Sequence, residues 1–124
     1  MPVDTKGWLR HDSLRFVVPQ LEPGRYDLTL TLRTTSRYPY TQLSLILRCR
    51  DKAHTFSRSD TVTFPVTDAK GVFQGHGTAI HEYFTPLTPI TLDTATAVIF
   101  TVTHNMSQDA LPGITDLGLT IEQQ

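Results

Sequence analysis

The side chains best suited to chemistry in this chain cluster around a short histidine-containing stretch. His76, His81 and Glu82 are the closest grouping of groups that bind metal ions. A metal site needs several such ligands to converge on one point. In a regular strand His76 and His81 project from opposite faces, and so do His81 and Glu82. Only a β-bulge at Gly75 or Gly77 would bring them together, so we predict no metal site and no cofactor.

Motifs for catalysis and for phosphate binding are incomplete. His81 begins HEYF rather than HExxH, and the chain contains no GxSxG. The glycine-rich stretch 71–77, GVFQGHG, lacks the Lys-Ser/Thr of a P-loop, and no helical pattern follows it. Cys49 follows Leu43, Leu45 and Leu47 at period two, which favours a buried thiol over a nucleophile. We therefore predict that the protein is not an enzyme; a hydrolase would need two titratable groups converging in a deep cleft.

Composition excludes several classes of protein. The chain has 124 residues, 39% hydrophobic and 19% charged, which suits one globular domain. A formal net charge of -1 lacks the basic footprint of a nucleic-acid-binding protein. No apolar run is long enough to span a membrane, and the N-terminus lacks the apolar region of a signal peptide. An exported form would therefore have lost its leader.

Hydrophobic periodicity predicts the elements that carry these side chains. Apolar residues alternate with polar ones at period two in four clear runs, 14–18, 26–32, 43–49 and 98–102. Turn-forming residues separate the runs, as at 22–25 and 68–71. Short strands at this spacing predict an all-β fold, a two-sheet antiparallel β-sandwich of jelly-roll type with roughly seven to nine strands.

The C-terminal stretch GITDLGLTIE predicts a final strand that contains two glycines. We expect Gly113 to supply a turn conformation, and Gly118 to mark a close backbone approach or a bulge. The stretch 105–113 before this strand is predicted to be a polar loop.

The order of several motifs resembles the gliding-motility-associated GldH lipoprotein family. Arg33 followed by Tyr38-Pro39-Tyr40 is similar to that family's R…YPY element, and Asp60-Thr61 to its DT pair. The stretch 71–77 resembles its glycine-rich segment, with Phe73 where the family usually has Trp. The closing match contains His104-Asn105-Met106, Leu111 and GITDLGLTIE, with Ser107 where an Arg is common.

This resemblance implies a non-catalytic envelope lipoprotein, anchored by an N-terminal lipid and facing the periplasm. It would act as a protein–protein scaffold in a motility- or secretion-type assembly of the outer membrane, with envelope proteins as partners. Residues 1–124 are then a single β-sandwich domain, with 1–7 a flexible remnant after the removed leader and lipid anchor. An open sheet edge could also add a partner strand.

The predicted binding surface consists of Arg33, Tyr38, Tyr40, Phe73 and His76. Exposed aromatics near turns stack on sugars or anchor protein partners, whereas buried ones belong to the core. Arg33 has the alternative role of pairing with Asp60 or Asp116. A carbohydrate-binding module is the alternative function: a row of exposed Trp or Tyr would favour it, and buried aromatics with an exposed apolar patch would favour a protein partner.

Overall fold

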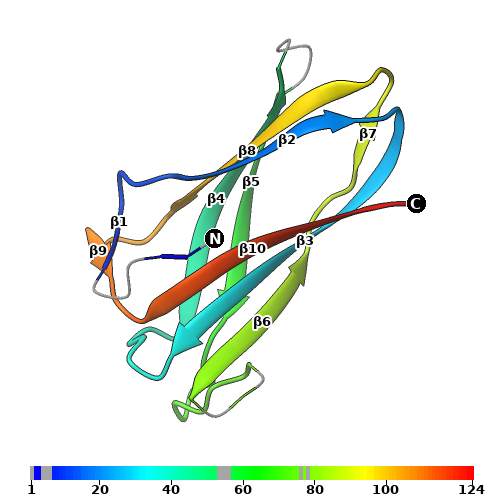
Figure 1. The fold of residues 1–124 in the computed structure, drawn as a ribbon. Coiled ribbons are helices and arrows are strands. Elements are labelled where there is room, and N and C mark those ends of the chain that lie inside the picture. Colours follow the sequence, from blue (N-terminus) through cyan, green and yellow to red (C-terminus); the bar gives the residue numbers. More distant parts are fainter. Residues whose placement is uncertain (1, 4–6, 53–56, 76, 78) are drawn as a thin grey trace.

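The computed structural model describes residues 2–3, 7–52, 57–75, 77 and 79–124. Within these residues the chain forms strands and no helix (Figure 1). The strands are β1 (Trp8–Leu9), β2 (Leu14–Leu21), β3 (Gly24–Thr35), β4 (Gln42–Asp51), β5 (Ser57–Pro65), β6 (Ile80–Pro86), β7 (Ile90–Leu92), β8 (Thr96–His104), β9 (Ala110–Leu111) and β10 (Ile114–Gln123). The described part of the chain accordingly contains no helix long and apolar enough to cross a membrane.

Two antiparallel sheets of four strands form the body of the protein. In the front sheet β3 is central, with β10 on one side and both β6 and β7 on the other. The back sheet has the order β2-β8-β4-β5. Figure 1 shows β10, β3 and β6 side by side in front of β4 and β5. Pairing of strands distant in sequence, such as β2 with β8, is typical of jelly-roll sandwiches. The predicted all-β sandwich is confirmed.

The hydrophobic core lies between the two sheets. Leu28, Leu30 and Leu32 of β3 are buried because alternate residues of the strand face inward. They belong to one cluster with the inward residues of the back sheet, which include Leu43, Leu45, Leu47, Val98, Phe100 and Val102. Removing a fully buried leucine side chain from such a core costs about 2–5 kcal/mol. The same alternation decides which residues of each strand lie on the outer faces of the two sheets.

A small third sheet covers one end of the sandwich. It pairs β1 with β9, placing Trp8 opposite Leu111, and both side chains are buried. The polar loop predicted for 105–113 thus contains a strand that was not predicted. Leu111 explains the difference, since this single apolar residue docks with Trp8 and brings the loop backbone into pairing distance.

The two glycines of the last strand have different roles. Gly113 has a φ of 85°, so its predicted turn conformation is confirmed. The prediction for Gly118 is wrong: a Cβ there would lie an ordinary 3.8 Å from Thr31 Cβ, and the register shift of β10 lies between Ile114 and Asp116. This irregularity is a bulge at the start of the strand.

The first residues of the chain pair with this bulged region. Pro2 bridges to Asp116, and the Val3 amide donates to the Thr115 carbonyl at 3.0 Å. The prediction of a flexible remnant over residues 1–7 therefore fails for these two residues. The reason is that the edge strand β10 offers free backbone groups for pairing.

A surface patch around Arg33 as candidate functional site

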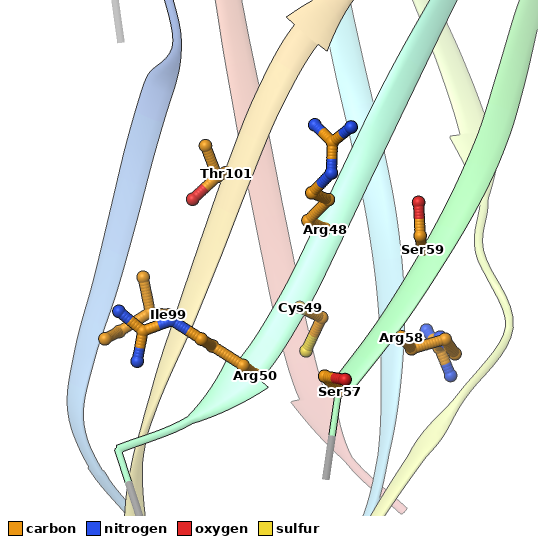
Figure 2. Close-up of a pocket in the computed structure, with 8 residues that line it drawn as sticks. All are labelled: Arg48, Cys49, Arg50, Ser57, Arg58, Ser59, Ile99 and Thr101. Carbon is orange, nitrogen blue, oxygen red and sulfur yellow. The ribbon is translucent and has the colours of Figure 1, made fainter. Parts of the chain in front are cut away.

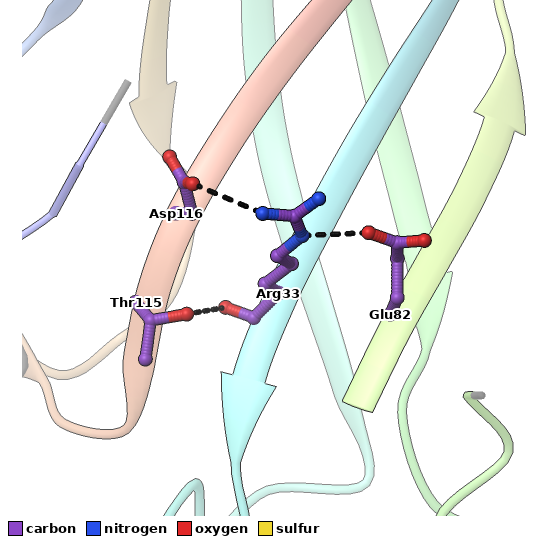
Figure 3. Close-up of polar contacts among 4 residues, drawn as sticks. All are labelled: Arg33, Glu82, Thr115 and Asp116. Atoms are coloured by element: carbon purple, nitrogen blue, oxygen red, sulfur yellow. Dashed lines mark hydrogen bonds and ion pairs between the residues drawn. The ribbon is translucent and has the colours of Figure 1, made fainter. Parts of the chain in front are cut away.

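The candidate site is centred on Arg33, on the outer face of the front sheet. In the register of the sheet Arg33 lies between Asp116 of β10 and Glu82 of β6. Its Nε is 2.6 Å from Glu82 Oε2, and its Nη1 is 3.6 Å from Asp116 Oδ2 (Figure 3). Thr115 Oγ1 donates to the Arg33 carbonyl at 3.1 Å. The guanidinium is thus held between two carboxylates that belong to neighbouring strands.

This ion-pair trio orients Arg33 without fixing the fold. The hydrogen bond to Glu82 raises the pKa of Arg33, and the charges of Glu82 and Asp116 add to the effect. Half of the Arg33 side chain is exposed, so water screens these pairs and they contribute little to folding stability. The same exposure leaves the planar guanidinium accessible for recognition.

Apolar side chains border the trio. Ile80 and Phe84 lie on either side of Glu82 along β6 and are 50% and 56% exposed. All three project from one face because side chains alternate along a strand. We call the surface that these side chains form the front patch; it consists of Arg33, Ile80, Glu82, Phe84 and Asp116. The patch joins exposed apolar area to an oriented charge.

A shallow hollow adjoins the front patch on the β10 side. Its volume is about 230 Å³, and Arg33 and Asp116 line it together with Thr31, Gly118, Leu119 and Thr120. Gly118 lies opposite Thr31 in the sheet register, and its missing side chain keeps this area low. The hollow therefore adjoins the charged part of the front patch, through Arg33 and Asp116.

The tyrosines of the predicted binding surface lie elsewhere. Tyr38 is 2% exposed, its hydroxyl donates to the Gln42 carbonyl at 2.8 Å, and burial raises the pKa of that hydroxyl. The half-buried Tyr40 packs edge-on against it, with ring centroids 5.5 Å apart. Tyr38 is a core residue, so its assignment to the exposed surface is corrected. The Tyr-Pro-Tyr sequence closes the connection between β3 and β4.

Phe73 supports the fold beside β6. Its ring stacks on His81, with centroids 4.1 Å apart and an interplanar angle of 7°. His81 is buried, and its Nε2 lies 3.1 Å from Ser36 Oγ. His81 and Glu82 face opposite sides, as predicted, because Glu82 pairs with Arg33 on the outer face. The predicted site residue His76 lies outside the described residues.

Burial decides the role of Cys49, and ion pairing decides which carboxylate is the partner of Arg33. Cys49 is a free, buried thiol, and burial raises its pKa to about 11, so the prediction of a buried cysteine is confirmed. Of the two carboxylates considered for Arg33, Asp116 is the partner, whereas Asp60 pairs with Arg58 at 2.8 Å. No group of three or more metal-ligating side chains occurs among the residues that the structure describes.

Sequence reasoning missed the apolar part of the front patch. Along 80–84 both alternations carry apolar or aromatic side chains, since Ile80 and Phe84 face outward while Tyr83 faces the core. Period two therefore could not indicate which set is exposed. The charge of Glu82, between Ile80 and Phe84, was the one available signal for the outward face.

Fold and site together define a β-sandwich domain whose candidate site is an exposed patch on a sheet face. The model of the family described as "GldH lipoprotein" matches residues 1–121 of this chain. The chain belongs to the GldH lipoprotein family, which makes it an envelope lipoprotein domain. No curated protein sequence matches it.

Among solved structures the chain is similar to one described as "CBM35 from Cellvibrio japonicus Abf62". The sequence identity is 16% and the TM-score 0.40, and the alignment covers 90% of this chain and 68% of that chain. At this level the likeness has no bearing on function.

Proposed function

We propose that this chain is the non-catalytic, protein-binding domain of a lipid-anchored, periplasm-facing envelope lipoprotein. The front patch is its contact surface for another protein of a motility- or secretion-type envelope assembly. The anchor restricts the domain to a membrane surface, which raises its effective concentration near such a partner.

The observation that carries the proposal is the pairing of Phe84 and Ile80 with Arg33. An exposed aromatic, an exposed aliphatic and an oriented arginine on one flat face match the composition of protein interface cores. Isolated exposed apolar residues are common on any protein, but here the two flank an ion-pair trio. The partner surface would place an apolar pocket over Phe84 and a carboxylate or carbonyl near Arg33.

The burial of the other aromatic residues favours a protein partner over a carbohydrate. Trp8, Tyr26, Tyr38 and Tyr83 are all buried, and Phe84 is the exposed aromatic among the described residues. A sugar-binding face needs a row of exposed aromatic rings, which this part of the chain does not offer.

The test is purification of the full-length lipoprotein from its native host after crosslinking of intact cells. Wild type is expected to recover a specific set of envelope proteins from the membrane fraction. With Phe84→Ser the recovery of these proteins is expected to fall at least tenfold. The reason is that truncating a central aromatic anchor costs about 2 kcal/mol or more of binding free energy.

Val72→Ser is the matched control, since Val72 is also 56% exposed and lies outside the front patch. It should recover the partners at the wild-type level. Equal recovery with Phe84→Ser and wild type would contradict the assignment of the front patch. Recovery of the wild type in the soluble fraction without any partner would contradict the anchored scaffold itself.

A further inference from the structure

The outer face of the back sheet is basic. Arg48 and Arg50 alternate along β4 with the buried Cys49, and Lys52 continues the same alternation just past the strand end. Arg15 of β2 lies in the same row as Arg48, with Thr101 of β8 between them. These four residues, Arg15, Arg48, Arg50 and Lys52, are referred to as the basic face.

No carboxylate of these strands lies beside Arg15, Arg48 or Lys52 on the outward side of the back sheet, as far as the described residues extend. The two acidic residues within its strands are Asp51 and Asp60. Asp51 is buried, and Asp60 is in register with the buried Leu47 and pairs with Arg58. The remaining outward positions of these strands carry uncharged side chains. The formal charges on this face are therefore all positive.

The basic face also offers hydrogen-bond donors and a shallow hollow. A depression of about 300 Å³ is lined by Arg48, Arg50, Ser57, Ser59 and Thr101, among others. Seen from outside the sheet, Thr101, Arg48 and Ser59 lie side by side on β8, β4 and β5 (Figure 2). Guanidinium groups and hydroxyls together are the donors that bind phosphate oxygens.

An apolar residue sits within the same surface. Val17 of β2 is 54% exposed and is paired with Ile99, whose other neighbour is Arg50. Figure 2 shows Arg50 extending toward Ile99, where its aliphatic stem helps to cover the isoleucine. A flat face with spaced cations and an exposed valine suits the headgroup region of a bilayer more than a narrow protein groove.

We propose that the basic face binds an anionic phospholipid surface, with phosphate groups held by Arg15, Arg48 and Lys52. The spacing suits separate headgroups, since Arg15 and Arg48 are two strands apart, roughly 10 Å. Membership of a lipoprotein family supplies the reason for proximity: a lipid-anchored domain samples the membrane at high effective concentration. The inference rests on that membership and not on the identity of a protein partner. Docked in this way, the domain turns its front patch away from the bilayer.

The experiment measures co-sedimentation of the 124-residue chain with vesicles at low and at high salt. One set of vesicles is phosphatidylcholine alone and the other contains phosphatidylglycerol. Binding is expected only to the phosphatidylglycerol vesicles, and it should decrease at high salt because screening weakens each contact. Arg15→Gln/Arg48→Gln should lower the partition coefficient by roughly thirtyfold, from the typical contribution of two basic residues at an anionic surface.

The matched control is Arg25→Gln/Arg37→Gln, which removes the same formal charge from exposed positions outside the basic face. It should bind like wild type, and the thermal unfolding of both double variants should show that each is folded. Equal losses in the two variants would overturn the proposal, because net charge alone would then explain binding. Retention of the chain on sulfated dextran, combined with no vesicle binding, would overturn it in favour of a soluble polyanion. Should Arg15→Gln/Arg48→Gln fail to fold, Lys52→Gln at the strand end gives the same comparison with a smaller expected loss.

Discussion

Gly113 is the residue that fixes the last strand against the loop after β3. Its φ of 85° lies in the region that favours glycine, and a Cβ built on it would come 2.8 Å from Tyr38 Cα. The Gly113 carbonyl accepts from the Thr35 amide at 2.7 Å. The Tyr-Pro-Tyr and Gly-Ile motifs, far apart in sequence, thus form one packed contact. Tyr38 matters for the fold rather than for a partner.

Gly113→Ala is therefore expected to destabilise the protein by about 2 kcal/mol or more, from backbone strain plus the clash with Tyr38. Gly71→Ala is the control, because Gly71 has a φ of 81° but nothing within 4 Å of the added Cβ. Backbone strain alone should lower the free energy of unfolding of Gly71→Ala by about 1 kcal/mol. Urea unfolding measures both, and equal losses would show that the contact with Tyr38 has no energetic role.

At the scale of elements, the β1–β9 pair acts as a cover for the end of β8. His104, the last residue of β8, is buried, and its ring meets Trp8 edge-on with centroids 5.7 Å apart. The Met106 amide donates to His104 Nδ1 at 3.3 Å, an interaction that requires this nitrogen to be unprotonated. Burial lowers the pKa of His104 below its ordinary value of 6.5.

This lowered pKa predicts a pH dependence of stability. Between the folded and the unfolded pKa of His104 the unfolded chain binds more protons, so the free energy of unfolding rises with pH in that window. The contribution of His104 to the free energy of unfolding is fully present above a pH of about 6.5, the ordinary His pKa. It decreases as the pH falls below that value. His104→Asn keeps an acceptor for the Met106 amide and should flatten the profile. Denaturant titrations at several pH values give the slope; an unchanged slope in the variant would assign it to other groups.

The longer strands were predictable from sequence because each buries one alternation of apolar side chains. The outward faces were less predictable, because position on a shared surface depends on cross-strand register. Arg33 was chosen from sequence, yet its neighbours Glu82 and Phe84 follow only from the pairing of β3 with β6. The cover formed by β1 and β9 was missed for a similar reason: two-residue strands carry no periodicity.

At the scale of the whole molecule, the two outer faces differ in charge. The front sheet presents Asp27, Glu82, Asp116 and Glu122 with Arg25 and Arg33, whereas the basic face carries Arg15, Arg48, Arg50 and Lys52. A nearly neutral total of -1 conceals this separation. A sandwich with opposite faces of opposite charge has a preferred orientation beside an anionic surface. The proposed protein contact and the proposed membrane contact are thus compatible, since they use different sheets.

The most direct measurement is site-specific photo-crosslinking in living cells, with the photoreactive residue placed at Phe84 in one strain and at Val17 in another. Both positions are exposed to a similar extent, 56% and 54%, so reactivity alone does not distinguish them. We expect a discrete envelope-protein adduct from position 84 and none of that protein from position 17. The same protein adduct from position 17, with no adduct from position 84, would contradict the assignment of the front patch as the protein-binding surface.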